Sequence, residues 1–211
     1  MDLSPTPKVI SSEKQNSTLF LAIAFGQHGR STRGLARKSL LLSSISLAIL
    51  YIEFGVWKGH SIKYFADKYK SASSEFYGFD TFYGFPEKCL SMEKGHYSTA
   101  GEMPQLNDVR IKFIKGLFQE TLPIFLKKIN FETKKKTVLV HFDAPLHSAT
   151  LFTLFKLSEK FTNYYFIFDQ LGTEECRALN NFNESTLSDY DLYFASLWNR
   201  APEVVFGKLK S

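Results

Sequence analysis

Short, almost continuously apolar segments alternate along the chain with longer segments whose apolar residues recur every three or four positions. The first pattern is typical of strands buried on both faces of a parallel sheet, and the second of helices that cover such a sheet. The predicted strands are residues 50–54, 76–79, 109–114, 137–142 and 164–168. The predicted helices are residues 35–49, a segment that ends at 69, and residues 119–129, 148–161 and 173–182.

The pattern changes near the end of the chain, where two strand-like segments replace the alternation. Residues 190–198 and 203–209 are joined by a short segment that contains Pro202, which is typical of a hairpin. We therefore expect an α/β fold: a Rossmann-like, doubly wound, mostly parallel seven-stranded sheet that ends in an antiparallel hairpin. The long polar connection over residues 84–108 is expected to cover a ligand cleft.

The composition fits one such domain. Of the 211 residues, 44% are hydrophobic and 16% are aromatic, which excludes disorder for most of the chain. We expect a domain over residues 35–211, preceded by a partly flexible extension over residues 1–34 that is a candidate lid. Cys89 and Cys176 lack metal-ligand spacing and are expected to be free thiols in a reducing compartment. Residues 40–56 are too polar for a membrane span and no signal peptide is recognisable, so we expect a cytoplasmic protein without membrane contact.

The formal net charge is +5, and the excess lies in residues 1–40, which hold six basic and two acidic residues. Arg30, Arg33 and Arg37 would share one face of a helix, where they would either bind an anionic acceptor or face solvent. No basic stripe runs through the rest of the chain, so nucleic acid is not the expected partner.

Carboxylates lie at or beside the ends of four of the five predicted parallel strands. They are Glu53, Asp80, Asp143 and Asp169, and Gly116 follows the remaining strand. Ligands of open α/β sheets bind beyond the carboxyl ends of the strands, so these positions form the candidate site.

The loop after the first strand, Glu53-Phe54-Gly55-Val56-Trp57-Lys58-Gly59-His60-Ser61, lacks the glycine spacing of a dinucleotide-binding loop. A carboxylate at Glu53 suits an ammonium group, although the segment is equally consistent with a purely structural strand–turn–helix. Asp80, 27 residues later, can accept hydrogen bonds from the hydroxyls of a ribose, or it can cap a turn. Together the two acids describe a ligand with a ribose and an amino-acid head, and S-adenosylmethionine fits that description.

Four segments carry a resemblance to a known family: Glu53–Ser61, Gly78–Glu87, Lys115–Pro123 and His141–Thr150. In this order and at strand ends, they resemble the macrocin-O-methyltransferase family of class I S-adenosylmethionine-dependent methyltransferases. The resemblance covers roughly residues 45–185.

The resemblance implies a cofactor site in three parts. The methionine end would be lined by Glu53, Gly55 and Ser61. The ribose would be bound by Asp80, and the adenine would lie beside Thr81 and Phe82. The rest of the adenine pocket would come from Gly116, Leu117 and Phe118.

The sequence departs from the family at the reacting centre, where the family's acids bind a divalent metal that holds the acceptor hydroxyls. Pro145 stands in place of the second of these acids, His147 in place of a tyrosine, and Gln170 in place of an acid. Asp143 and Asp169 remain, so a weak Mg²⁺ site on these two is one expectation. Asp143 and His147 are the candidate catalytic residues, with His147 as a base; a capping or buried histidine is the alternative.

The sequence therefore predicts a methyltransferase that acts on a hydroxyl of a small molecule. The resemblance suggests a sugar or a glycosylated natural product as acceptor, and a homodimer is a candidate assembly. The alternatives are a module that binds S-adenosylmethionine without methyl transfer, and a methyltransferase acting on nucleic acid or protein.

Overall fold

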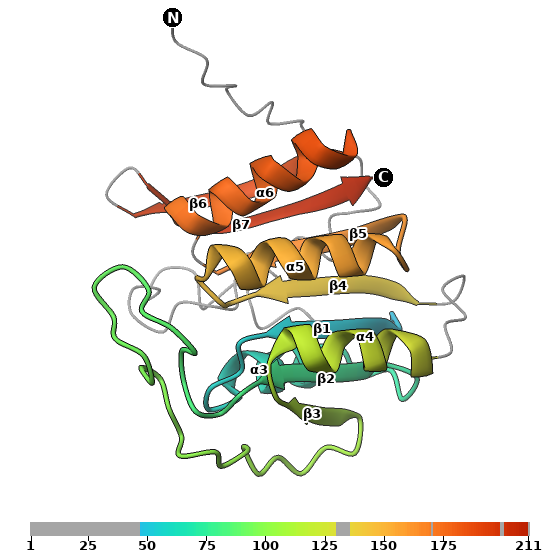
Figure 1. Cartoon of the computed structure of the whole chain (residues 1–211). Coiled ribbons are helices and arrows are strands. Elements are labelled where there is room, and N and C mark those ends of the chain that lie inside the picture. The colour runs from blue at the N-terminus through green and yellow to red at the C-terminus, as the bar shows by residue number, and fades with distance from the viewer. Residues whose placement is uncertain (1–46, 130–135, 170, 199–200, 211) are drawn as a thin grey trace, which may run out of the picture.

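The computed structural model describes residues 47–129, 136–169, 171–198 and 201–210. In chain order, the elements labelled in Figure 1 are β1 (Ile49–Phe54), α3 (His60–Lys68), β2 (Glu75–Asp80), β3 (Ile111–Lys115), α4 (Phe118–Lys128), β4 (Thr137–Phe142), α5 (His147–Ser158), β5 (Asn163–Phe168), α6 (Thr173–Thr186), β6 (Asp189–Trp198) and β7 (Ala201–Lys210).

The seven strands form one sheet in the order β3-β2-β1-β4-β5-β7-β6. The first five strands of the chain are parallel to one another, whereas β7 is antiparallel to both β5 and β6. The predicted α/β doubly wound fold and its closing hairpin are therefore confirmed. The strand order reverses between β1 and β4, which in open α/β sheets is where ligands bind.

Helices cover both faces of the sheet, because the strands alternate between two apolar cores. Leu50, Ile52 and Phe54 of β1 point into the larger core beneath α4, α5 and α6, which lie in front of the sheet in Figure 1. Ile49 and Tyr51 point to the other face, where they pack with Ile62 and Phe65 of α3.

Several boundaries differ from the prediction by one to four residues. Residue 49 was expected to end a helix, but Ile49 begins β1 because it pairs with Thr137 and is fully buried. The third strand begins at Ile111 rather than 109, since Val109 is 95% exposed in the turn before it. Helix α6 continues to Thr186, four residues beyond the predicted end. The rest of the helix expected over 35–49 and the extension over 1–34 lie outside the described residues.

Two smaller expectations concern the cysteines and the membrane. Cys89 is buried and Cys176 is exposed, and both are free thiols, as predicted. None of the helices in the described ranges combines the length and the apolar character that crossing a bilayer requires.

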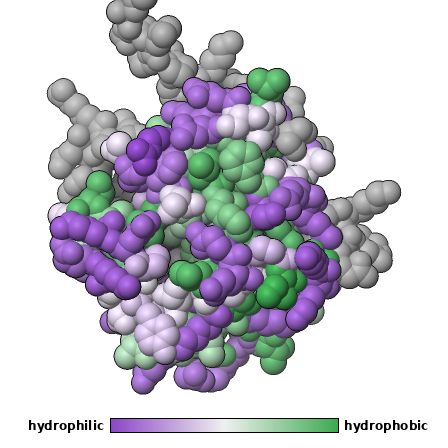
Figure 2. Space-filling view, in the orientation of Figure 1, coloured by the Kyte–Doolittle hydropathy of each residue, from purple (hydrophilic) through white to green (hydrophobic). Residues whose placement is uncertain are grey.

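Figure 2 shows apolar residues scattered among polar ones on the face that carries α4, α5 and α6.

Candidate functional site

A cavity of about 630 Å³ opens at the carboxyl ends of the parallel strands. Its walls come from the loops that follow β1, β3, β4 and β5 and from the first part of the connection between β2 and β3. The predicted site residues that line it are Gly55, Asp80, Thr81, Leu117, Phe118, Asp143 and Asp169. Five other predicted residues are outside its lining, namely Glu53, Ser61, Phe82, Gly116 and His147.

Gly55 brings the loop after β1 into contact with the loop after β4. Its φ of +93° is a conformation that side chains rarely adopt, and a Cβ at this position would overlap the carbonyl oxygen of Asp143. Only glycine fits there, so the two strands on either side of the order reversal present their loops to one another at the cavity floor.

Asp80 holds the two loops that form the cofactor side of the cavity. Its Oδ2 accepts hydrogen bonds from the backbone amides of Val56 and Trp57 at 2.8 and 2.9 Å, and its Oδ1 accepts one from the amide of Phe82 at 2.8 Å. The carboxylate therefore organises the loop after β1 and the turn after β2. Two carboxylate oxygens offer about four acceptor positions, so room remains for a ligand hydroxyl.

Glu53, at the end of β1, lies behind the loop that follows this strand and is fully buried. Ser61 Oγ donates a hydrogen bond to its Oε1 at 2.7 Å, and the Tyr51 hydroxyl donates to its Oε2 at 2.6 Å. His141 Nδ1 lies 2.8 Å from the same hydroxyl. In this arrangement Glu53 fixes the start of α3 through Ser61, whereas the sequence placed both residues against the methionine end of the cofactor.

The polar network around Glu53 changes the pKa of two of its members. Burial, followed by the charge and hydrogen bond of Glu53, raises the pKa of Tyr51 well above its ordinary value. Burial alone would lower the pKa of His141, but the hydrogen bonding and charge of Glu53, with the charges of Asp143 and Asp169, raise it overall. The tyrosine thus stays a neutral hydroxyl that links the histidine to the carboxylate.

Phe82 anchors the connection between β2 and β3 rather than facing the cavity. Its side chain is 1% exposed and packs edge-on against Phe113, with ring centroids 6.1 Å apart. Its carbonyl accepts hydrogen bonds from the amides of Thr99 and Gly101. Gly116, whose φ is +142°, turns the chain after β3 so that Leu117 and Phe118 reach the cavity.

Asp143 and Asp169 follow β4 and β5 and line the same cavity. The Asp143 side chain is open to the cavity, but protein surrounds it closely, and this raises the pKa of its carboxyl to about 8. Positive charge on His141 opposes the shift, whereas the charges of Asp169, Glu53 and Asp80 add to it.

The described part of the chain contains no group of three or more His, Cys, Asp or Glu side chains placed to hold a metal ion. Asp143 and Asp169 therefore offer Mg²⁺ at most two carboxylates, and Gln170 lies outside the described residues. No step proposed below uses a metal.

His147 is the first residue of α5. Its Nε2 lies 3.2 Å from Nδ2 of Asn181, which belongs to α6, and it does not contribute to the cavity lining. The contact connects the two helices, and the role of His147 as a base stays a prediction.

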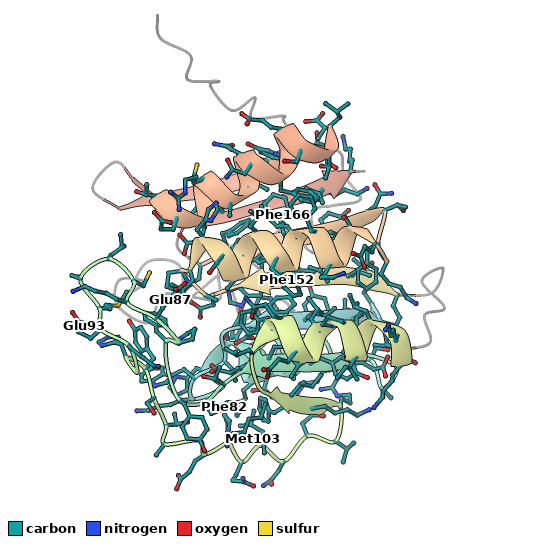
Figure 3. The ribbon with its side chains drawn as sticks, in the orientation of Figure 1. Phe82, Glu87, Glu93, Met103, Phe152 and Phe166 are labelled. Atoms are coloured by element: carbon teal, nitrogen blue, oxygen red, sulfur yellow. The ribbon has the colours of Figure 1, made fainter. Side chains whose placement is uncertain are left out.

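The structure adds lining residues that the sequence did not indicate. Phe85, Glu87 and Tyr97 come from the connection between β2 and β3, and Ser148 and Glu175 come from α5 and α6. Figure 3 shows Glu87 beside the start of α5, where Ser148 Oγ donates a hydrogen bond to its Oε1 at 3.1 Å. The only feature of the sequence at Glu175 is an acid in the first turn of a helix, which stabilises the helix and does not indicate a cavity.

Comparison with known proteins finds similarity in solved structures alone: no family model matches the chain, and no curated protein matches it. An O-methyltransferase from Bacillus cereus in complex with S-adenosylhomocysteine is 13% identical, with 97% of this chain and 94% of that chain covered and a TM-score of 0.46. The O-methyltransferase TomG from Streptomyces achromogenes, involved in tomaymycin synthesis and solved with S-adenosylmethionine, is 11% identical over 97% and 92% of the two chains, with a TM-score of 0.47. A methyltransferase from Podospora anserina bound to S-adenosylhomocysteine is 12% identical over 76% and 70%, with a TM-score of 0.45. We therefore build the function from the residues of the cavity.

Proposed function

We propose that this protein is an S-adenosylmethionine-dependent methyltransferase that acts on a hydroxyl group of a small molecule. The observation that carries the proposal is the single cavity in which the Gly55 loop, Asp80, Leu117 with Phe118, and Asp143 meet. These groups lie at the ends of β3, β2, β1 and β4, which are neighbours in this order in the sheet. An extended ligand can therefore touch all of them.

The cofactor would lie along the strand ends. Asp80 would accept a hydrogen bond from a ribose hydroxyl, while Leu117 and Phe118 would contact the adenine. The methionine end would lie over Gly55, where the absence of a side chain lets the ligand approach the backbone. Glu53 and Ser61 would act indirectly, by fixing the loop and the start of α3.

The reaction would be a direct displacement at the methyl carbon. The acceptor oxygen forms a bond to the methyl group, the carbon–sulfur bond breaks, and its electron pair stays on sulfur to give S-adenosylhomocysteine. Asp143, which borders both the Gly55 loop and the acceptor side, would accept the hydroxyl proton. The protein would contribute mainly alignment of the two reactants and exclusion of water.

The acceptor class suggested by the resemblance is a sugar or a glycosylated natural product, and the cavity volume lies within the range usual for small-molecule sites. We also propose that residues 1–34 form an extension of the domain. The proposed assembly is a homodimer, and the proposed location is the cytoplasm.

Calorimetry with S-adenosylhomocysteine tests the cofactor site. We expect binding to the full chain, and we expect Asp80→Asn to weaken it by roughly 1.5–3 kcal/mol, the range for hydrogen bonds to charged groups. Asp67→Asn is the matched control, because Asp67 is exposed on α3 and pairs with Lys63 and Lys70. Thermal unfolding of both variants shows whether the fold is kept.

Absence of binding, or equal affinity of the two variants, would contradict the proposed cofactor site. Methyl transfer is then measured with methyl-labelled S-adenosylmethionine and a panel of hydroxyl compounds. Binding without transfer to any of them would instead favour a module that binds the cofactor only.

A further inference from the structure

The cavity extends well beyond the groups assigned to the cofactor. Phe85, Glu87 and Tyr97 of the connection line it together with residues of the loops before α5 and α6. Cys89 fixes this part of the connection, since it packs with Leu146 and Ala149 and its thiol lies 3.7 Å from the carbonyl oxygen of Pro145. The part of the cavity that Glu87, Ser148 and Glu175 line, called the acceptor compartment below, is where an acceptor would sit.

The charge of the cavity is one-sided. Six carboxylic acids line it, namely Asp80, Glu87, Glu120, Asp143, Asp169 and Glu175. Among the described residues, no lysine, arginine or histidine belongs to its lining. S-adenosylmethionine carries one net positive charge, and Asp80 already accepts hydrogen bonds from three backbone amides. The lining of the described residues therefore favours a ligand that brings positive charge.

Glu175 is the most enclosed of these acids, with 6% of its surface exposed. The donors that reach its carboxyl are backbone amides at the start of α6, its own and that of Gly172; none of the side chains in the described ranges donates to it. Burial raises the pKa of this carboxyl to about 7. Glu87 lines the same cavity as Glu175, from the connection between β2 and β3.

Apolar groups complete the acceptor compartment. Phe85 and Tyr97 lie edge to face with ring centroids 5.6 Å apart, and Met92 lies on the same side. A ligand bound here would therefore meet aromatic and thioether surface on the connection and carboxylates on the side of α5 and α6.

We propose that the acceptor carries a positively charged amine beside its reactive hydroxyl, and that Glu175, together with Glu87, binds this amine. The proposal rests on the methyltransferase function proposed above and specifies its substrate class. It differs from the sequence-based expectation of an anionic acceptor. The arginines that would bind such an acceptor, Arg30, Arg33 and Arg37, lie outside the described residues. An ammonium group fits because it donates to carboxylates, and a buried carboxylate gains most from a charged donor.

Two matched sets of probes test the charge preference in the presence of saturating S-adenosylhomocysteine. The first set is tyramine, 4-ethylphenol and 4-hydroxyphenylacetate, and the second is glucosamine, glucose and glucuronate. In the first set the phenol is kept while the charge of the side chain changes from positive through neutral to negative. In the second set an ammonium replaces the 2-hydroxyl of glucose or a carboxylate replaces its 6-hydroxymethyl group, and the other hydroxyls are kept. We expect the ammonium member of at least one set to bind about 10-fold or more tighter than its neutral partner, and the anion to bind weakest.

The variant Glu175→Gln keeps the shape and the hydrogen bonds to the backbone amides while removing the charge. We expect it to reduce the preference for the ammonium probe to less than about 3-fold without changing the affinity for S-adenosylhomocysteine. Glu174→Gln is the matched control, since Glu174 is the preceding residue of α6 and pairs with Arg177 on the surface. In the unchanged protein, the affinity for the ammonium probe should also rise with pH through about 7, as the Glu175 carboxyl loses its proton.

The outcomes separate this proposal from the proposed function. If S-adenosylhomocysteine binds but neutral or anionic probes are preferred, or if no ammonium probe binds, the substrate class is wrong and the methyltransferase proposal stands. A preference that survives Glu175→Gln would remove Glu175 from the site. Failure of S-adenosylhomocysteine to bind would overturn both.

Discussion

At the scale of single residues, the polar group of Tyr51, Glu53, Ser61 and His141 links the core to the site. Tyr51 and Glu53 are two positions apart on one strand, so they share the face that α3 covers, and His141 is the register neighbour of Glu53 on β4. The three contacts described above each involve the Tyr51 hydroxyl or the Glu53 carboxylate.

Tyr51→Phe removes the hydroxyl and leaves Glu53 Oε2 and His141 Nδ1 without it in a fully buried place. We expect a loss of about 1–3 kcal/mol in the free energy of unfolding, the usual cost when a buried carboxylate oxygen loses its hydrogen-bond donor. Tyr77→Phe is the control, because its hydroxyl donates to the partly exposed Glu75 at 3.2 Å, where water can replace it. Denaturant unfolding measures both, and equal losses would contradict the special role of Tyr51.

Part of the cavity lining could be predicted from the sequence for a physical reason. An acid directly after a buried strand must lie at the carboxyl edge of the sheet, and this placed Asp80, Asp143 and Asp169 at one cavity. The sequence could not tell whether a side chain at that edge points up into the cavity or sideways beneath a helix. Glu53 does the latter, because strand alternation turns it toward α3, and Tyr51 on the same strand supplies its donor.

At the scale of elements, the connection between β2 and β3 forms one wall of the cavity without being a helix or a strand. It is held at one end by Phe82 and in its middle by Cys89. Four non-glycine residues in it adopt positive φ, namely Phe82, Leu90, Tyr97 and Ala100. Its path thus depends on tertiary contacts that no periodic pattern encodes. The strands and helices, in contrast, could be predicted from their apolar periodicity.

Phe82→Ala should loosen this connection selectively. We expect amide hydrogen exchange to accelerate at Thr99 and Gly101, whose amides bind the carbonyl of Phe82, and a global loss of about 3–5 kcal/mol for the truncated ring. Leu90→Ala, at a side chain of the same connection that is 68% exposed, should leave exchange nearly unchanged. Exchange that rises equally in both variants would show that Phe82 is not the anchor.

At the scale of the whole molecule, the buried acid Glu175 makes stability depend on pH. Its pKa rises from an ordinary 4.5 to about 7 on folding, so the folded protein holds this proton more tightly than the unfolded chain. Stability should therefore fall as pH rises from about 4.5 to about 7, by up to roughly 3 kcal/mol at 1.36 kcal/mol per pKa unit. Glu174, Glu87 and Cys89 are the titratable neighbours of the group.

Glu175→Gln should reduce the fall of Tm with pH over this window and raise Tm at pH 8 relative to the unchanged protein. Part of the fall should remain, because the pKa of Asp143 is also raised, to about 8. Glu174→Gln should change the slope less, because the charge of Glu174 adds less to the pKa of Glu175 than burial does. Thermal unfolding at half-unit pH steps measures both curves, and parallel curves for all three proteins would show that Glu175 titrates normally.

The position of β7 has a consequence for the order in which the sheet can be assembled. β6 is made before β7 but pairs with β7 in the sheet, and β7 alone joins it to β5. During synthesis, β5 therefore presents an open edge, and β6 has no place to dock, until residues 201–210 have appeared. Exposed strand edges invite pairing between chains. Aggregation of nascent or truncated chains should thus begin at β5, so a chaperone that shields this edge would act late in synthesis, after the cavity-forming strands are already in place.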